Sequence, residues 1–156
     1  MAWPSAGGLS LTYAAIGSIG DLRLPSPGVT ARVDELWRTT CFEAFVRAPG
    51  GEAYLEFNFA PSHEWAAYRF ESYRAGMSQA TGFAQPSIET HKDADRFELR
   101  ALVDLGDFPP AGLALSAVIE ETSGVKSYWA LAHPEGKPDF HHSAGIVLNL
   151  AAPERP

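Results

Sequence analysis

The spacing of apolar side chains constrains this chain more than any other feature, because apolar and polar residues alternate with a period of two along most of its length. No segment keeps an apolar stripe at i, i+3, i+4 and i+7 over the roughly 11 residues that identify an amphipathic helix. Alternation predicts strands, since successive side chains of a strand point to opposite faces of its sheet. The expected strands, about ten in all, cover Leu9–Ile16, Gly20–Leu24, Thr39–Arg47, Ala53–Ala60, Glu64–Tyr73, Ser87–His91, Arg96–Val103, Leu113–Glu121, Ser127–His133 and Ala144–Leu150.

One of these segments, Glu64–Tyr73, has a helical alternative, because Trp65, Tyr68 and Tyr73 also approximate the spacing of one helix face. Segments rich in proline and glycine, such as 49–51 and 109–112, separate the others. Short strands separated in this way are typical of antiparallel β-sandwiches and jelly rolls. We therefore expect an all-β antiparallel sandwich or jelly roll that forms a single domain over residues 1–156, with a disordered tail at 151–156.

The charge and cysteine content exclude several classes of protein. The net charge is −7 and no cluster of lysine and arginine is present to neutralise phosphates, so we expect no nucleic-acid partner. Cys41 is the single cysteine, which excludes an intrachain disulfide. The N-terminus has no secretory pattern, and no apolar run approaches the roughly 20 residues of a membrane span. We expect a cytoplasmic protein without a membrane partner.

The central strands are expected to have one core face and one mixed face. On the core face the alternation places two apolar sets, Phe42, Ala44 and Val46, and Leu55, Phe57 and Phe59. The other face should present four polar side chains among aromatic ones, namely Glu43, Glu56, Asn58 and Arg69 among Phe45, Tyr54 and Trp65. One interpretation is a solvated sheet face. The other is a ligand site, since aromatic planes with carboxylates, amides and arginine suit a sugar.

The segment Tyr128–His142, YWALAHPEGKPDFHH, carries three histidines whose spacing matches no common zinc motif. Met77 with His141 or His133 would supply the axial ligands of a haem b. Calcium is a further possible cofactor, in the acidic segment 104–107. Neither cofactor is predicted outright. A metal- or carboxylate-dependent enzyme acting on a sugar stays open as well, and would use Glu43, Glu56, Asp139 and His141.

Four stretches of the chain resemble a known family. RVDELWRTTCFEAFV, YLEFNFAPSHEWAAYRFESYRAGM, LSAVIEE and SYWALAHPEGKPDFHH are together similar to the bacterial DOMON-like proteins, a β-sandwich group related to the family 9 carbohydrate-binding modules. The resemblance covers roughly Leu9 to Leu150, and the wider superfamily includes both sugar-binding modules and b-type haem domains. It implies that Trp37 and Glu43, six residues apart, contact a sugar, with a polar contact from Asn58 or Arg69.

The same resemblance implies a second aromatic wall near the C-terminus, from Phe140, His141 or Trp129. Taken together, these expectations describe a non-catalytic module that binds a small ligand, expected to be a saccharide, on a concave sheet face capped by the loop 133–142. No catalytic residue is assigned, and the oligomeric state is left open. The expected ligand-binding residues are Trp37, Glu43, Glu56, Asn58, Arg69, Trp129, His133, Phe140 and His141.

Overall fold

The computed structural model describes residues 8–150, which form ten β-strands and three short 3₁₀ turns. The strands are β1 (Gly8–Ile16), β2 (Cys41–Arg47), β3 (Tyr54–Phe59), β4 (Trp65–Phe70), β5 (Ser78–Gln79), β6 (Ser87–Lys92), β7 (Arg96–Asp104), β8 (Gly112–Glu120), β9 (Lys126–Ala130) and β10 (Leu148–Asn149). The 3₁₀ turns are η1 (Ile19–Asp21), η2 (Leu36–Arg38) and η3 (Ser143–Gly145). The expected tail at 151–156 lies outside the described residues.

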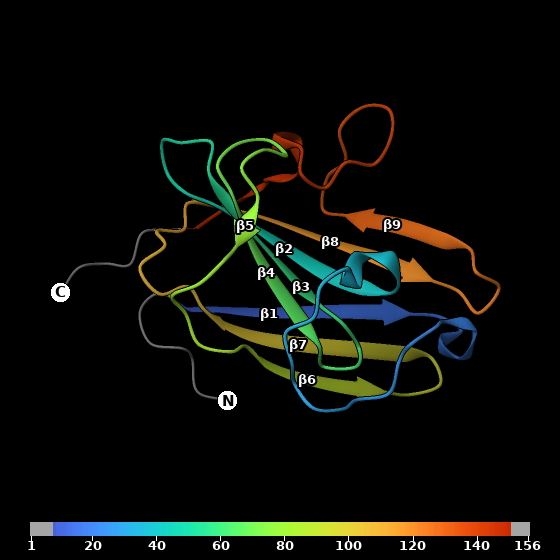
Figure 1. Cartoon of the computed structure of the whole chain (residues 1–156). Coiled ribbons are helices and arrows are strands. Elements are labelled where there is room, and N and C mark those ends of the chain that lie inside the picture. Colours follow the sequence, from blue (N-terminus) through green and yellow to red (C-terminus); the bar gives the residue numbers. More distant parts are fainter. Residues whose placement is uncertain (1–7, 151–156) are drawn as a thin grey trace.

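The strands build two antiparallel sheets that face one another, so the expected all-β sandwich is confirmed (Figure 1). One sheet has three strands in the order β1-β7-β6. The other has seven, in the order β10-β8-β2-β3-β4-β5, with β9 also paired to β8. No helix within residues 8–150 is long and apolar enough to cross a membrane.

The core lies between the two sheets, and the residues predicted to face it do so. Phe42, Ala44 and Val46 of β2 join Leu55, Phe57 and Phe59 of β3 in one buried cluster. The three-stranded sheet contributes Phe97, Leu99, Ala101 and Val103 of β7. Stacked sheets hold such a layer about 10 Å thick between them. The alternation of the sequence therefore identified the inner face of β2 and β3, but not that of β4, where Trp65 faces the core instead of the mixed face on which it was expected.

Three expected elements differ from the structure. The strand expected at Gly20–Leu24 is wrong: this segment contains η1, because the chain turns a corner there and only Leu22 forms a bridge, to Glu121. The last expected strand, Ala144–Leu150, consists of η3 followed by the two-residue β10. The helical alternative for Glu64–Tyr73 is also wrong, since β4 pairs with both β3 and β5.

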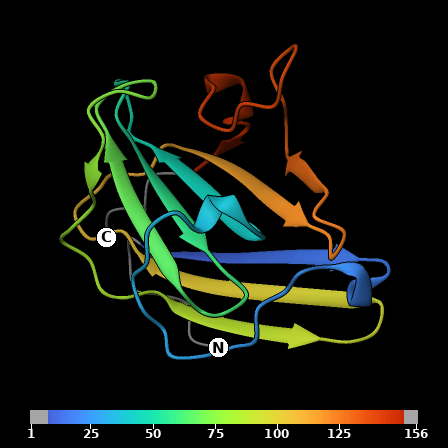
Figure 2. The same ribbon diagram turned by 45° about the vertical axis from the view of Figure 1, so that its right-hand side comes forward.

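One edge of β8 carries two different strands. β9 pairs with Ser116–Glu120 and β10 with residues 112–113, while β2 occupies the other edge. The segment 131–147 leaves this edge after β9 and returns to it as β10. Between these points it projects beside the outer face of the seven-stranded sheet (Figures 1 and 2). The topology thus brings the histidine-rich loop to the sheet face that is turned away from the core.

Candidate ligand-binding site

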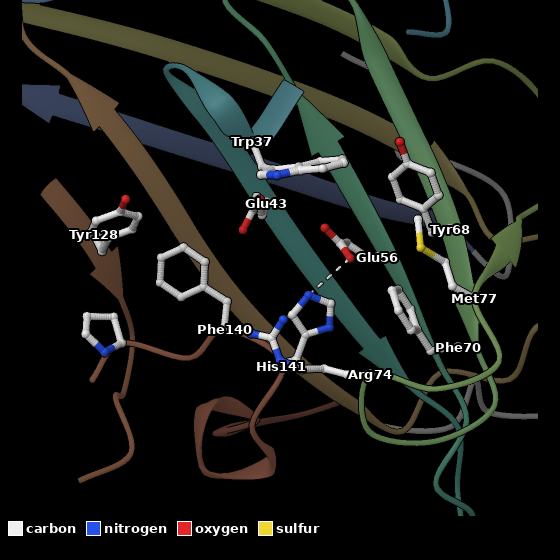
Figure 3. Close-up of a pocket in the computed structure, with 11 residues that line it drawn as sticks. Trp37, Glu43, Glu56, Tyr68, Phe70, Arg74, Met77, Tyr128, Phe140 and His141 are labelled. Atoms are coloured by element: carbon white, nitrogen blue, oxygen red, sulfur yellow. Dashed lines mark ion pairs between the residues drawn. The ribbon is translucent and has the colours of Figure 1, made fainter. Parts of the chain in front are cut away.

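The outer face of the seven-stranded sheet carries a pocket of about 450 Å³. Its floor comes from β2, β3 and β4, and its walls come from η2, β9, the loop after β4 and the loop before η3 (Figure 3). Residues opposite one another in an antiparallel pair share a face, so the register fixes which side chains meet here. The lining residues are Trp37, Glu43, Glu56, Tyr68, Phe70, Arg74, Met77, Tyr128, Pro138, Phe140 and His141.

Two buried carboxyl groups form the polar part of the floor. Glu43 on β2 lies opposite Asn58, and Glu56 lies two residues before Asn58 on β3, so the two acids are diagonal neighbours on adjacent strands. Only 3% of Glu43 and 5% of Glu56 is exposed. Ser116 Oγ donates to Glu43 Oε2 at 3.2 Å from the neighbouring strand β8. Both carboxyl groups open into the same hollow (Figure 3).

Burial makes both acids hold their protons at unusually high pH. The pKa of Glu43 rises to about 8, mainly by desolvation and then by repulsion from Glu56, against the Ser116 hydrogen bond. Desolvation likewise raises the pKa of Glu56 to about 7, although Asn58 and the charge of Arg74 favour its ionised form. Two neighbouring carboxyl groups near neutral pKa can share a proton, accept hydrogen bonds or exchange protons with a ligand.

Asn58 lies beneath this floor and is fully buried. Neither its Oδ1 nor its Nδ2 has a hydrogen-bond partner among the described residues. Its amide lies near enough to Glu56 to lower the pKa of that carboxyl, but the two groups do not form a hydrogen bond of ordinary geometry. Buried polar groups without partners are rare and costly. Together with Glu43 and Glu56, Asn58 therefore makes this part of the outer face unusually rich in buried polar groups.

His141 reaches the floor from the loop that covers it. Its Nδ1 lies 2.8 Å from the hydroxyl of Tyr54, which already accepts the backbone N–H of Arg74 at 3.2 Å. In the tautomer in which this hydroxyl donates to Nδ1, the ring proton is on Nε2, 3.5 Å from Glu56 Oε2. Burial first, and then the charge of Arg74, lower the pKa of His141 to about 4, so the ring is neutral at pH 7. Both ring nitrogens thus face groups of the protein.

Asp139 fastens this loop to the segment after β4. Its carboxylate accepts hydrogen bonds from the hydroxyl of Tyr73, from Arg74 Nη2 at 2.8 Å and from the backbone N–H of His141 at 3.2 Å. Partial burial raises the pKa of Asp139, but the hydrogen bonds from Tyr73 and Arg74 outweigh it, so the pKa lies below its ordinary value. The charge of Arg74, the cation of the pocket lining, is neutralised by this contact.

Replacing Asp139 by alanine is expected to release the loop 133–142 while the sandwich stays folded. Hydrogen bonds to a charged group contribute roughly 1.5–3 kcal/mol, so amide exchange in the loop should accelerate at least about tenfold. Exchange in β2 and β3 should stay unchanged. Asp107→Ala, at an exposed acid elsewhere, is the control. Unaltered loop exchange in the Asp139 variant would mean that this carboxylate does not fasten the loop.

Aromatic side chains form most of the walls. Trp37 on η2 is 40% exposed and meets Tyr68 edge-on, with ring centroids 6.4 Å apart. Tyr68 donates to Asp34, which also accepts from Gln79 and so links the segment just before η2 to β4 and β5. The indole lies above the two carboxyl groups, with Phe140 across the hollow (Figure 3).

The pocket brings together five of the nine residues expected from the sequence. Trp37, Glu43, Glu56, Phe140 and His141 line it, and the loop 133–142 contributes part of its wall, as expected. Asn58 shares the face but lies below the surface of the hollow.

Three expected residues lie elsewhere. Arg69 was placed on the wrong face: it lies opposite Leu55 in the register, so it points away from the pocket and pairs with Glu71. Trp129 lies opposite Ala117 and lines a different hollow near β1, with its indole N–H bonded to Ser127. His133 is exposed and tilts against Phe140 without lining the pocket.

Several lining residues were not expected from the sequence. Tyr68 and Phe70 replace Arg69 because they occupy the positions of β4 that face outward. In β4 both alternating sets of positions contain apolar residues, and Tyr68 and Phe70 belong to one of them. Either choice of inner face would have buried a large aromatic residue, so the sequence did not show which set faces outward. Arg74 and Tyr128 come from a loop and an edge strand, and no sequence period predicts their position.

Two cofactor hypotheses can be compared with this geometry. Met77 and His141 do line the same pocket, as an axial pair for haem would require, although both nitrogens of His141 face protein groups. Within residues 8–150, no three or more histidine, cysteine, aspartate or glutamate side chains gather to hold a metal ion. In the acidic segment considered for calcium, Asp104 instead accepts the backbone N–H of Gly106 and closes a turn.

Comparisons of the chain with protein-family models, with curated proteins and with solved structures give no match. The resemblance to DOMON-like proteins therefore stays an expectation from the motifs quoted above. The class that the fold and the pocket define is an antiparallel β-sandwich with an aromatic, acid-floored pocket on its outer face.

Proposed function

We propose that this protein binds a small polyhydroxylated ligand, a saccharide, in the pocket beneath Trp37 and that it does so without chemistry. The observation that carries the proposal is the combination of aromatic walls with two buried carboxyl groups on one floor. Aromatic planes pack on the apolar C–H faces of a pyranose, while carboxyl groups accept hydrogen bonds from its hydroxyls. The volume of about 450 Å³ suits a ligand of one or two sugar rings.

Two further features support a saccharide. Trp37 is exposed although the contacts of Leu36 and Asp34 hold its turn in place, which is the state of an aromatic platform rather than of a core residue. The family resemblance implied that Trp37 and Glu43, six residues apart, both contact a sugar, and both residues line this pocket.

A b-type haem domain is the second candidate, because Met77 and His141 share the pocket. It is supported less well than a saccharide site. Iron ligation by His141 would require breaking its contact with Tyr54 or with Glu56, and would place two buried acids against an apolar macrocycle.

Trp37→Ala is expected to weaken sugar binding at least about tenfold and to change the free energy of unfolding by less than about 1 kcal/mol, because the indole is part-exposed. A buried tryptophan would instead cost roughly 3–5 kcal/mol. Isothermal titration with a panel of mono- and disaccharides measures binding, and thermal melting measures stability.

Trp129→Ala is the matched control, since this indole is 62% exposed and lies outside the pocket. It should leave sugar affinity unchanged. If no sugar of the panel binds the unaltered protein, or if both tryptophan variants lose affinity equally, the proposed site is wrong.

A further inference from the structure

The floor of the pocket is rich in acidic acceptors and short of cations. Glu43 and Glu56 are each at least nine-tenths buried and open into the hollow. Arg74 is the cation among the lining residues, and its guanidinium is engaged by Asp139 at 2.8 Å. His141 is neutral at pH 7. Among residues 8–150, neither carboxyl group therefore forms an ion pair with a lysine or arginine, and the charge of Arg74 acts on Glu56 only from a distance.

Keeping two buried carboxyl groups without a cationic partner costs free energy unless a ligand binds them. Desolvation opposes the ionisation of both acids, and repulsion from Glu56 adds to it at Glu43. Glu56 makes no hydrogen bond of ordinary geometry among the described residues. The adjacent Asn58 amide is buried below the hollow with both polar atoms unpartnered among the described residues, so it gives the two acids no hydrogen bond of ordinary geometry. The missing complement is a donor-rich, positively charged group.

The walls also favour a cation. A cation close to the face of a tryptophan or tyrosine ring is attracted by the negative charge of that face, more strongly where water is excluded. Trp37 lies above the two carboxyl groups, and Tyr68 and Phe140 stand at the sides of the same hollow (Figure 3). A neutral hydroxyl placed there would gain hydrogen bonds but would use neither the charge of the acids nor that of the ring faces.

We propose that the pocket selects an amino sugar, whose protonated amine binds between the carboxyl groups of Glu43 and Glu56 while its ring packs under Trp37. This inference rests on the proposed saccharide function and names the class of saccharide. On binding, the proton that the pair holds in the free protein is released to solvent, and the ammonium donates to both carboxylates. The hydroxyls of the ring occupy the part of the pocket near His141 and Arg74.

Titration calorimetry at pH 7.5 with glucosamine, N-acetylglucosamine and glucose tests the proposal. Glucosamine and N-acetylglucosamine have the same ring, but the first carries an amine where the second carries a neutral amide. Glucosamine is expected to bind at least about tenfold more tightly than the other two. In Glu43→Gln and in Glu56→Gln this preference should fall below about threefold, because the affinity for glucosamine should fall by a larger factor than the affinity for glucose. Glu52→Gln, at an exposed acid in the turn between β2 and β3, should keep the full preference. Circular dichroism checks that each variant is folded. If only one of the two glutamine variants folds, that variant alone is enough for the test.

Each remaining outcome counts against at least one of the two proposals. Equal binding of glucosamine and glucose by the unaltered protein overturns the amino-sugar inference and leaves the saccharide function standing. A preference that survives in both glutamine variants overturns the assignment of the ammonium to this pair. Cyclohexylamine serves as an amine without hydroxyls: if it binds as tightly as glucosamine while glucose fails to bind, the saccharide function itself is overturned, and the inference with it.

Discussion

Replacing Phe57 by alanine is expected to lower the free energy of unfolding by roughly 3–5 kcal/mol, the usual cost of truncating a buried aromatic residue. Phe57 is fully buried at the centre of β3, and its ring lies 6.2 Å from that of Phe59 and 5.4 Å from that of Phe83. Domains of this kind unfold with only about 5–15 kcal/mol, so the variant should melt far earlier in urea or on heating.

Phe57→Leu separates the cavity from the loss of the aromatic ring, because leucine fills most of the same volume. It should cost no more than roughly 1.5 kcal/mol. Phe57 points away from Glu56 and Asn58, its neighbours in the strand, so both variants should keep their ligand affinity at temperatures where they are folded. Equal melting of the alanine variant and the unaltered protein would contradict the assignment of this face to the core.

The fold was predictable from the sequence because the central strands have one continuous apolar face. In β2 and β3 the inward positions are all apolar and buried, so the period of two was unambiguous. Gly20–Leu24 was wrong because an alternating pattern over five residues also fits a corner of the chain. There Leu22 N–H donates to Ile19 and closes a 3₁₀ turn.

The candidate site was predictable only where the strand phase was clear. Glu43 and Glu56 follow from the apolar faces of their own strands, whereas β4 is apolar in both phases. The turn between β3 and β4 settles that phase, because it pairs Phe59 with Trp65 and so places Arg69 on the same sheet face as Leu55, where it stays exposed. His63 has a positive φ of 74° in this turn, a backbone state that residue types alone do not reveal.

The cover of the pocket depends on contacts between loops that are distant in sequence. His141 lies 87 residues from Tyr54, and Asp139 lies 65 residues from Arg74. The sequence indicated the polar, aromatic character of Tyr128–His142 but could not show that β9 and β10 share one edge of β8. That shared edge is what returns the loop across the outer face and excludes Trp129 from it.

The stability of the ligand-free protein is expected to fall as the pH rises from about 6.5 to 8. The folded-state pKa values of Glu43 and Glu56 are raised to about 8 and 7, so the folded state holds protons that the unfolded state has already released. Stability is then lost as the pH rises through the folded values, by about 2 kcal/mol over this window at roughly 1.4 kcal/mol per proton and pH unit. His141 acts in the opposite sense, but only between its folded pKa of about 4 and its ordinary value of 6.5. Burial also raises the pKa of Cys41, which affects stability only above the window.

The double variant Glu43→Gln/Glu56→Gln isolates this effect, because it keeps the shape of both side chains and removes their titration. Its free energy of unfolding, measured by urea titration at pH 6.5, 7.25 and 8, should be nearly constant and should exceed that of the unaltered protein at pH 8. Glu52→Gln, an exposed carboxyl near the same strands, should retain the original slope. A flat profile in the unaltered protein would mean that water or a counter-ion already compensates the pair, and the electrostatic need for a bound ammonium would disappear with it. If the free energy of unfolding falls with pH in the unaltered protein and in Glu52→Gln but not in the double variant, the carboxyl groups responsible are Glu43 and Glu56 at the floor of the pocket.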